Sequence, residues 1–313
     1  MSATAWSLAD VPDQTGRTVV VTGPSHGGLG HRTALELARR GARVVLAGRT
    51  PAKLDETADA VRDEVPGAEV ERLVVDLADL DSVRRAGEEA TALGPLHVLV
   101  NNAGVMGTRR SRTRDGLDLQ LATNHFGPFL LTGLLLPQLA AGEGRVVTVS
   151  SQAHRLARRA PLGDPRDPAE QGGRRYRTWR TYGQSKLANL LFTAELDRRC
   201  REAGVPVTAL AAHPGFAGTH LAANGRFGRA SGGVASVLDA AVRAVSQSAA
   251  AGAWPTLMAA TADLPGGSYV GPSGPAEARG VPRLTTGNSL ARDPDAAREL
   301  WRLSRRTTGI SYP

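Results

Sequence analysis

The sequence predicts a single α/β domain of the doubly wound kind, a parallel sheet with helices on both faces. The first observation is a regular alternation of short β-branched segments and helical segments, separated by turn signals. The second is a glycine-rich stretch, residues 23–30, between the first expected strand and the first expected helix. The third is a length of 313 residues without any change in composition that would mark a domain boundary.

The expected strands and helices follow one another in order. The segment 17–22 contains three consecutive valines between two threonines, which is typical of a buried strand. Gly41 stands where a helix over 29–40 would end, and Pro51 is a favoured first residue for the next helix. Further strands are expected at 43–47, 70–75, 96–100, 145–149 and 205–211, with helices at 79–92, 115–139 and 182–201.

The remaining segments carry weaker signals. The C-terminal part is rich in glycine and proline, with an edge strand expected at 268–270 and a last helix at 295–305 that would bury Leu300, Trp301 and Leu303. We divide the rest into an N-terminal extension (1–14) before a domain of 15–313, an arginine-rich insertion (155–180), an ordered loop (215–233), a helix (234–250) and a C-terminal extension (252–313).

The composition excludes several classes of function. Hydrophobic residues make up 41% and charged residues 22%, as in soluble globular proteins. The net charge of +8 suits an anionic cofactor, but only 4% of residues are aromatic and none interleave with a basic run, which argues against nucleic-acid binding. Cys200 is the only cysteine, and the histidines and carboxylates show no metal-ligand spacing, so we expect no metal. Residues 1–15 do not resemble a secretory leader, and the apolar run 129–141 is too short for a membrane span, so a soluble cytoplasmic protein is expected.

Tyr182 and Lys186 form the first candidate site. Residues four apart lie on one face of a helix, and the leucines of 187–191 fall on an adjoining face that could pack on a core. A phenol titrates near pH ~10, and a neighbouring ammonium favours the phenolate and lowers its pKa. Lys186 and Lys53 are the only lysines among 38 basic residues, so a lysine at this place is informative. The pair is a candidate for general acid–base catalysis.

The glycine-rich stretch is the second candidate site. Glycines between a strand and a helix let the backbone approach a pyrophosphate, which the helix N-terminus stabilises. Where an acidic residue closing the second strand would bind the ribose 2′-hydroxyl of NAD, this sequence has Arg49, which suits a 2′-phosphate. We therefore expect NADP(H) in preference to NAD(H). The alternatives are a plain glycine turn and an arginine that meets only solvent or an acidic neighbour.

Several short motifs are weak alone and specific together: Thr22-Gly23 with Gly28-Leu29-Gly30, Asp76-Leu77, Asn101-Asn102-Ala103-Gly104, Asn124-His125-Phe126-Gly127, Ser150-Ser151, Tyr182-Gly183-Gln184-Ser185-Lys186 and His213-Pro214-Gly215. In this order the sequence resembles the short-chain dehydrogenase/reductase family, in its retinol-dehydrogenase-like and WW-domain-oxidoreductase-like branch. The resemblance covers residues 15–220, and more loosely the C-terminal part. It implies a Rossmann-type fold and hydride transfer to or from a nicotinamide.

The resemblance also implies a role for each matching residue. Tyr182 would be the acid–base residue, and Lys186 would lower its pKa and hold the nicotinamide ribose. Ser151, preferred to Ser150 on register, would hydrogen-bond the substrate oxygen, and Asn124 would hold a water that links Lys186 to solvent. The cofactor-binding residues would be Gly23, Ser25, His26, Gly28, Leu29, Gly30, Arg49, Asp76, Leu77, Asn101, Asn102, Ala103, Gly104, Tyr182, Lys186, Pro214, Gly215 and Thr219.

Two departures from the family pattern leave alternatives open. The glycine-rich stretch holds one extra residue, with Pro24 and His26 inside it, which either bulges harmlessly or spoils the cradle. The arginines of 155–180 either rim the substrate mouth, favouring an anionic or carrier-bound substrate, or form a solvated loop. Asn124 could instead bridge helix and strand backbone. The histidines expected to pack or to bond the backbone, rather than to act as ligands, are His125, His154 and His213.

The expected function is NADP(H)-dependent hydride transfer between the nicotinamide and a carbonyl or alcohol of a mostly apolar small molecule. A dinucleotide-binding regulatory or scaffold protein without turnover is the alternative from another class, which the extra residue in the glycine-rich stretch leaves open. A sugar-nucleotide epimerase or dehydratase fits poorly, because such proteins show another glycine spacing and a larger C-terminal domain. Pocket walls are expected from 216–227, and the helices at 115–139 and 182–201 could form the face of a homodimer or homotetramer.

Overall fold

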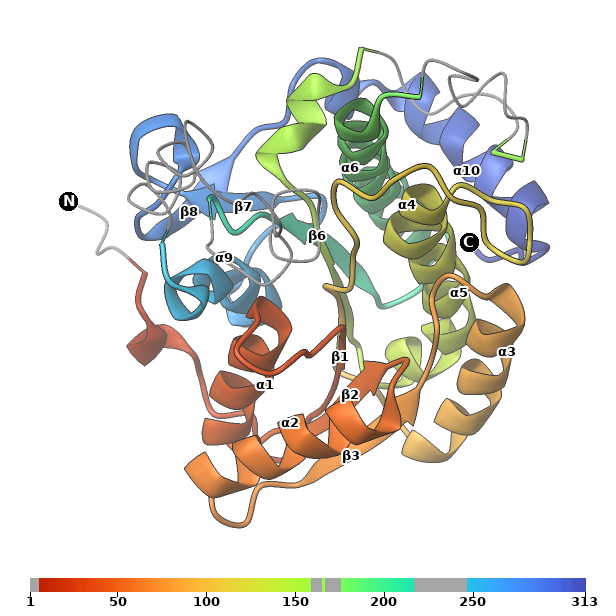
Figure 1. The fold of residues 1–313 in the computed structure, drawn as a ribbon. Coiled ribbons are helices and arrows are strands. Elements are labelled where there is room, and N and C mark those ends of the chain that lie inside the picture. Colours follow the sequence, from red (N-terminus) through yellow and green to blue (C-terminus); the bar gives the residue numbers. More distant parts are fainter. Residues whose placement is uncertain (1–5, 159–164, 167–175, 217–246) are drawn as a thin grey trace, which may run out of the picture.

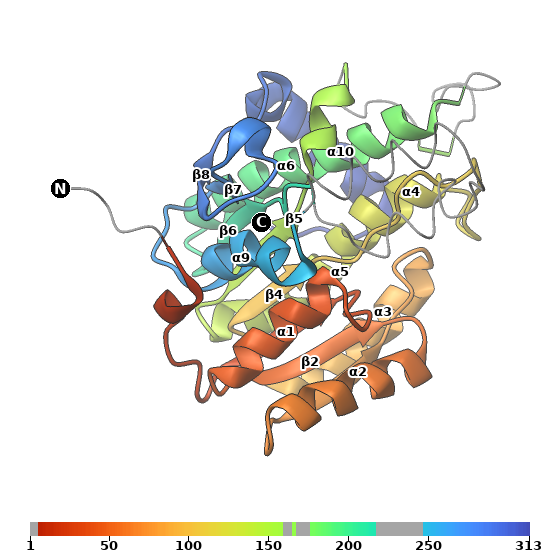
Figure 2. The ribbon, with the colours of Figure 1, turned by 60° about the vertical axis from the view of Figure 1, so that its left-hand side comes forward.

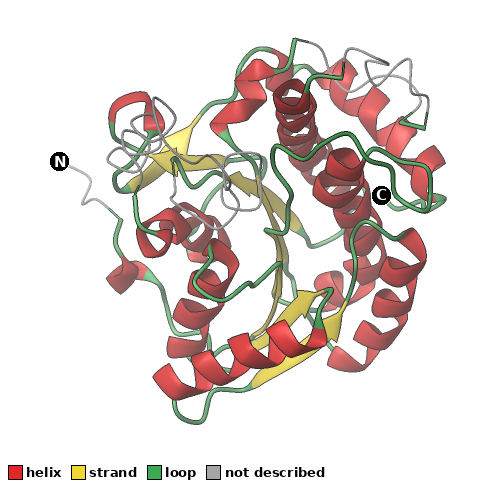
Figure 3. Ribbon diagram, in the orientation of Figure 1, coloured by secondary structure: helices red, strands yellow, loops and turns green. Residues whose placement is uncertain are grey.

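A single sheet forms the centre of the protein (Figures 1 and 3). The computed structural model describes residues 6–158, 165–166, 176–216 and 247–313. Their strands are β1 (Thr18–Thr22), β2 (Arg43–Gly48), β3 (Val70–Val74), β4 (Val98–Asn101), β5 (Arg145–Val149), β6 (Thr208–Ala212), β7 (Tyr269–Pro272) and β8 (Pro282–Thr285). In the described residues the order is β3-β2-β1-β4-β5-β6-β7-β8, and all neighbours are parallel except β7 and β8.

Helices cover both faces of this sheet, as Figures 1 and 2 show. They are α1 (Leu29–Arg39), α2 (Pro51–Glu64), α3 (Leu80–Glu89), α4 (Leu119–Leu121), α5 (Gly127–Ala141), α6 (Thr178–Glu202), α9 (Ala249–Thr261) and α10 (Pro294–Thr308). Helices α1, α2 and α9 share one core with Val19 and Val21, whereas α3, α5 and α6 share the other with Val20. Because β1 needs apolar side chains on both faces, its sequence is a continuous β-branched run. The predicted doubly wound α/β fold is confirmed. Among the residues described, no helix combines the length and the apolar sequence that a membrane span requires.

The helix predicted at 115–139 begins later than expected and is not uniform. The Asp118 carboxylate accepts hydrogen bonds from the amides of Gln120 and Leu121, so the helix begins at Leu119. A π-helical turn, Ala122–Phe126, then separates α4 from α5. Such turns are frequent at functional sites, and this one contains Asn124.

The C-terminal part contains more regular structure than the sequence indicated. Helix α9 was not predicted, because the C-terminal part was described only as rich in glycine and proline, yet Pro255 lies inside the helix and is buried. The strand predicted at the sheet edge, 268–270, is β7, and it is not an edge strand, since β8 lies outside it. The sixth strand begins at Thr208 rather than at residue 205. The expected helix over 234–250 and most of the loop over 215–233 lie outside the described residues.

Helix α10 packs against α6 and buries the three apolar residues that the sequence predicted to be buried. Leu300, Trp301 and Leu303 are all buried, and the Trp301 ring stacks on Phe192 of α6 with 5.9 Å between ring centroids. The hydroxyl of Tyr312 donates a hydrogen bond to a backbone carbonyl of α5 at 2.9 Å. The chain's own C-terminus therefore covers part of the α5 and α6 surfaces that were expected to form a dimer face.

Candidate active site

A cavity of about 240 Å³ opens at the carboxyl ends of β1 to β4. Strand β1 pairs with β2 on one side and with β4 on the other, so the cavity lies where the strand order reverses, the usual ligand site of such sheets. The predicted residues that line it are Gly23, Ser25, Gly28, Leu29, Arg49, Asp76, Leu77, Asn102, Ala103 and Gly104. The lining residues that the sequence did not single out are Ala47, Gly48, Val75, Val105 and Thr123. Most of them lie at the end of a strand or directly after one, and this position is the signal that could have identified them.

The other predicted cofactor residues lie outside this lining. Gly30 is a packing position, because a Cβ there would lie 2.5 Å from Nδ2 of Asn102. His26 is exposed, and Pro214 and Gly215 follow β6. Asn101 is buried in β4, where its Nδ2 donates to the Thr132 hydroxyl at 3.0 Å. The last predicted residue, Thr219, lies outside the described residues.

Inside the glycine-rich stretch, which holds the extra residue, Gly27 is bonded to His31 of α1, a contact that we call the latch. The Gly27 amide, at a φ of 72°, donates a hydrogen bond to Nδ1 of His31 at 3.0 Å. His26 stacks on the His31 ring, with 4.9 Å between centroids and 25° between planes. Burial, with smaller effects of His26 and Arg32, lowers the pKa of His31 to about 4. The ring is therefore neutral at pH 7, and Nδ1 remains an acceptor that holds the loop.

Arg49 extends from the end of β2 into the cavity lining. Arg49 is exposed, and among the described residues its guanidinium has no hydrogen-bond or ion-pair partner. The following helix α2 begins at Pro51, has no acidic residue in its first turn, and is not capped by the Thr50 side chain. Within the described part of the chain, an unpaired cation therefore stands beside an uncapped helix N-terminus, an environment that favours an anion.

Tyr182 lies on α6, next to the turn that follows β5. This turn carries Ser150 and Ser151, and we call it the serine turn. Its side chain is 8% exposed, and burial raises its pKa to about 12, although a hydrogen bond with the Ser151 side chain opposes this rise. The Trp179 ring stands edge-on to the Tyr182 ring, with 6.1 Å between centroids. Tyr182 is thus a protonated phenol at neutral pH, in contact with a hydroxyl.

Lys186 lies one turn further along α6 and is 4% exposed. Its Nζ donates to the Val149 carbonyl at 2.9 Å and lies 5.9 Å from the centroid of the Tyr182 ring. Burial lowers the pKa of Lys186 to about 8. We expected Lys186 to lower the pKa of Tyr182, but in this structure the desolvation of the buried phenol dominates and the shift has the opposite direction.

The side chain of Asn124 bridges two parts of the site. Its Oδ1 accepts from the Val105 amide at 2.8 Å, and its Nδ2 donates to the Val105 carbonyl and to the Ser185 hydroxyl, both at 2.9 Å. The side chain thus ties the π-helical turn to the chain after β4 and to α6. Its role in holding a water stays a prediction.

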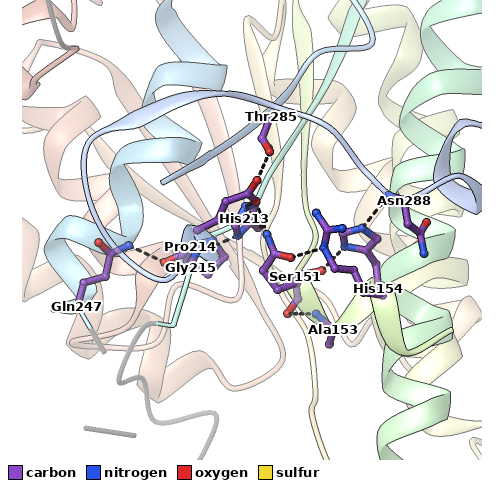
Figure 4. A network of polar contacts seen from close by, with 12 residues as sticks. Ser151, Ala153, His154, His213, Pro214, Gly215, Gln247, Thr285 and Asn288 are labelled. Atoms are coloured by element: carbon purple, nitrogen blue, oxygen red, sulfur yellow. Dashed lines mark hydrogen bonds and ion pairs between the residues drawn. The ribbon is translucent and has the colours of Figure 1, made fainter. Parts of the chain in front are cut away.

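The two serines after β5 differ in environment. Ser150 is 2% exposed, and its hydroxyl donates to the backbone carbonyl of Lys186 at 2.7 Å. Its proton is therefore engaged within the protein. The Ser151 oxygen accepts from the Ala153 amide at 3.1 Å, which leaves its proton available. The geometry therefore favours Ser151 as the substrate-facing hydroxyl. The contacts of His154 and His213 are shown in Figure 4.

Comparisons with known proteins agree with this geometry. A family model described as short chain dehydrogenase matches residues 17–160. The chain is 39% identical over 313 residues to polyprenol dehydrogenase of Mus musculus, covering 96% of this chain and 86% of that protein. It is 43% identical over 211 residues to retinol dehydrogenase 12 of Mus musculus, covering 67% of this chain and 64% of that protein. The match thus spans just under two thirds of that retinol dehydrogenase.

Two solved structures are also similar. A crystal structure of an uncharacterised protein from Mycobacterium paratuberculosis has a TM-score of 0.78 and 42% identity, covering 99% of this chain and all of that chain. A gluconate 5-dehydrogenase structure from Beutenbergia cavernae, with bound NADP at low occupancy, has a TM-score of 0.61 and 28% identity, covering 80% of this chain and 91% of that one. From its sequence, its sheet and these relatives, the chain belongs to the short-chain dehydrogenase/reductase family, in the retinol-dehydrogenase-like branch.

Proposed function

We propose that this protein is an NADP(H)-dependent oxidoreductase that transfers a hydride between the nicotinamide and a carbonyl or alcohol of a mostly apolar small molecule. The observation that carries the proposal is the contact between Tyr182 and Ser151, with Lys186 one helical turn away. These residues lie at the carboxyl edge of the sheet, and the cavity lies at the same edge. A positioned proton donor beside a hydroxyl is what carbonyl reduction requires of the protein.

The lining of the cavity supports binding of a dinucleotide. A Cβ at Gly23 would lie 2.7 Å from the Cα of Ala103, and one at Gly28 would lie 3.0 Å from the Ser25 carbonyl oxygen, so the cradle depends on bare backbone. Gly23, Ser25 and Gly28 would hold the pyrophosphate at the N-terminus of α1. The bound cofactor would supply the hydride.

The protein's own contribution would be to orient the substrate and to move one proton. Because its pKa is about 12, the Tyr182 hydroxyl carries a proton at pH 7 and can give it to a carbonyl oxygen during reduction. The Ser151 hydroxyl would donate to the same oxygen. The Lys186 ammonium would stabilise the phenolate that remains, since a positive charge nearby favours the ionised form.

Arg49 supports the preference for NADP(H). A 2′-phosphate beside it would receive charge-assisted hydrogen bonds that a ribose 2′-hydroxyl cannot match. No carboxylate of the cavity lining stands at the end of β2, where NAD-binding sites use one.

An apolar substrate is supported by the surroundings of Tyr182. Leu156 and Trp179 are 52% and 42% exposed, and Phe216, just after the end of β6, is 49% exposed. Trp179 contacts the Tyr182 ring, and Leu156 packs over Gly183, which follows Tyr182 in the chain. The relatives named for retinol and polyprenol, both apolar alcohols, agree with this choice. The arginine-rich insertion lies mostly outside the described residues, so an anionic or carrier-bound substrate stays a prediction.

Assembly and location stay predictions as well. A homodimer or homotetramer through α5 and α6 would require the C-terminal segment to move from those helices or to join the interface. Activity in the cytoplasm is expected.

The test of the proposed function is consumption of NADPH with a panel of apolar aldehydes and ketones, followed by absorbance. Tyr182→Phe removes only the hydroxyl and should lower kcat by about 10²–10⁴-fold while NADPH still binds. Tyr312→Phe is the matched control, because its hydroxyl bonds a carbonyl of α5 away from the cavity. NADPH binding without turnover of any substrate, or full turnover by Tyr182→Phe, would contradict the proposal and favour the scaffold alternative.

A further inference from the structure

The carboxylate of Glu277 joins three separate parts of the chain. It lies in a short turn of the C-terminal extension, Pro275–Glu277, and its side chain is 16% exposed. It accepts hydrogen bonds from the Gln152 amide group, directly after Ser151, and from the Thr285 hydroxyl of β8. His213, the residue after β6, contacts it through Nε2 at 2.9 Å. Figure 4 shows Thr285, His213 and Ser151, which lie around these contacts.

The protonation states of this cluster are set by its neighbours. Burial would raise the pKa of Glu277, but the Thr285 hydrogen bond and the nearby His213 outweigh it and lower the pKa. Burial keeps the pKa of His213 below its ordinary value, so its ring is neutral at pH 7. The Gly215 amide donates to Nδ1 of His213 at 3.2 Å, which places the ring proton on Nε2, facing Glu277. The cluster is an anionic acceptor surrounded by neutral donors.

The backbone at Glu277 is strained. Ala276 and Glu277 have φ values of 49° and 53°, in the left-handed region that non-glycine residues rarely adopt. This conformation is unfavourable for residues that carry a side chain, so the surrounding contacts must hold the turn in place. The bonds made by the carboxylate are contacts of this kind.

A second connection reaches the same serine turn. His154 is fully buried, and one ring nitrogen, Nδ1, lies 2.7 Å from the Ser151 carbonyl oxygen. The backbone amide of Asn288 donates to Nε2 of His154 at 3.3 Å, so the ring proton is on Nδ1. Nδ1 donates this proton to the Ser151 carbonyl. The C-terminal extension thus holds the turn through Gln152 on one side and His154 on the other.

We propose that Glu277 is a positioning residue, which fixes the turn after β5 so that the Ser151 hydroxyl faces Tyr182. The inference rests on the proposed function, because it assigns Ser151 a task in catalysis. Glu277 itself touches neither the Tyr182 hydroxyl nor the cavity lining, so it acts only through Gln152 and the turn. Replacing the carboxylate by an amide puts an NH₂ donor against existing donors while conserving volume.

The experiment measures Glu277→Gln, Ser151→Ala and the double variant in the full-length protein. We expect Glu277→Gln to lower kcat by about tenfold or more, with the Kd for NADPH, measured by calorimetry, changed by less than about threefold. In the Ser151→Ala background the same change should lower kcat by no more than about twofold, because the hydroxyl that it positions is already gone. A residue of purely structural importance would lower kcat by the same factor in both backgrounds. Glu299→Gln, on the exposed face of α10, is the matched control.

The wild type is measured first, which separates the two hypotheses. A wild type that neither binds NADPH nor turns over would overturn the proposed function and this inference together. A working wild type with unchanged kcat in Glu277→Gln, or with equal factors in both backgrounds, would overturn this inference alone. If circular dichroism shows that Glu277→Gln does not fold, Thr285→Val removes one of the same donors and keeps its shape. A fall in kcat with Thr285→Val that disappears in the Ser151→Ala background supports the inference, and equal factors overturn it.

Discussion

Lys186 should lower the stability of the protein without cofactor, and Lys186→Met should raise it. The side chain is 4% exposed, and burial lowers its pKa from 10.5 to about 8. A fall of that size corresponds to about 3 kcal/mol of unfavourable free energy for the charged form. Methionine keeps the apolar stem, and the Val149 carbonyl still accepts from Nδ2 of Asn189 at 3.0 Å, so no acceptor is orphaned. We therefore expect the free energy of unfolding at pH 7 to rise by about 1–3 kcal/mol while turnover is lost.

The stability difference between the wild type and Lys186→Met should change with pH in a definite direction. The pKa of Lys186 in the folded state lies below the unfolded value of 10.5. Below pH 8 both states are protonated, so the full cost of burying the charge is present. Between about pH 8 and 10.5 the unfolded state binds more protons, so the stability of the wild type rises with pH relative to the variant. The advantage of Lys186→Met should be smaller at pH 9 than at pH 7.

The assay is urea unfolding of both proteins at the two pH values. Lys53→Met is the matched control, because Lys53 is exposed on α2 and its replacement should change stability by no more than about 0.5 kcal/mol. A variant less stable than the wild type at pH 7, or an advantage that grows toward pH 9, would refute the reasoning. Either result would show that the Lys186 ammonium is net stabilising in its buried place.

Three further changes test other parts of the site. Arg49→Ser should weaken NADPH binding by about 10–100-fold and NADH binding little, as calorimetry would show; equal losses would contradict the role of Arg49. His31→Leu removes the acceptor of the Gly27 amide and should weaken NADPH binding by about tenfold, whereas 2′,5′-ADP, which lacks the pyrophosphate, should bind as before. A loss shared by 2′,5′-ADP would argue against the latch. Gly183→Ala would place its Cβ 2.6 Å from the Ala153 carbonyl and should lower stability by about 1–3 kcal/mol in thermal unfolding; an unchanged Tm would mean that the serine turn yields.

The parts of the fold that could be predicted are those with a strong local signal. Strands β1 and β5 are buried on both faces, and they appear in sequence as short β-branched runs between turns. Residues just after such strands meet at one edge of a parallel sheet, which is why Gly23 and Arg49 could be assigned to one cofactor site from their positions, whereas Asp76 was assigned from the family resemblance.

The parts that could not be predicted depend on distant contacts. Helix α9 contains a glycine and a proline, and it forms because it packs between α1 and the sheet. The bond between Gln152 and Glu277 joins residues 125 positions apart, and nothing near either residue announces it. The direction of the Tyr182 pKa shift depends on burial, whereas the sequence indicated only the neighbouring Lys186.

Calorimetric titration of the purified protein with NADPH and with NADH, without substrate, tests the central claim most directly. The latched glycine-rich stretch and the guanidinium of Arg49, which has no partner among the described residues, predict micromolar binding of NADPH and binding of NADH weaker by about tenfold or more. Equal affinities would contradict the assignment of Arg49. Binding of neither nucleotide would mean that the extra residue has closed the cradle, and it would contradict the account of the protein as an oxidoreductase.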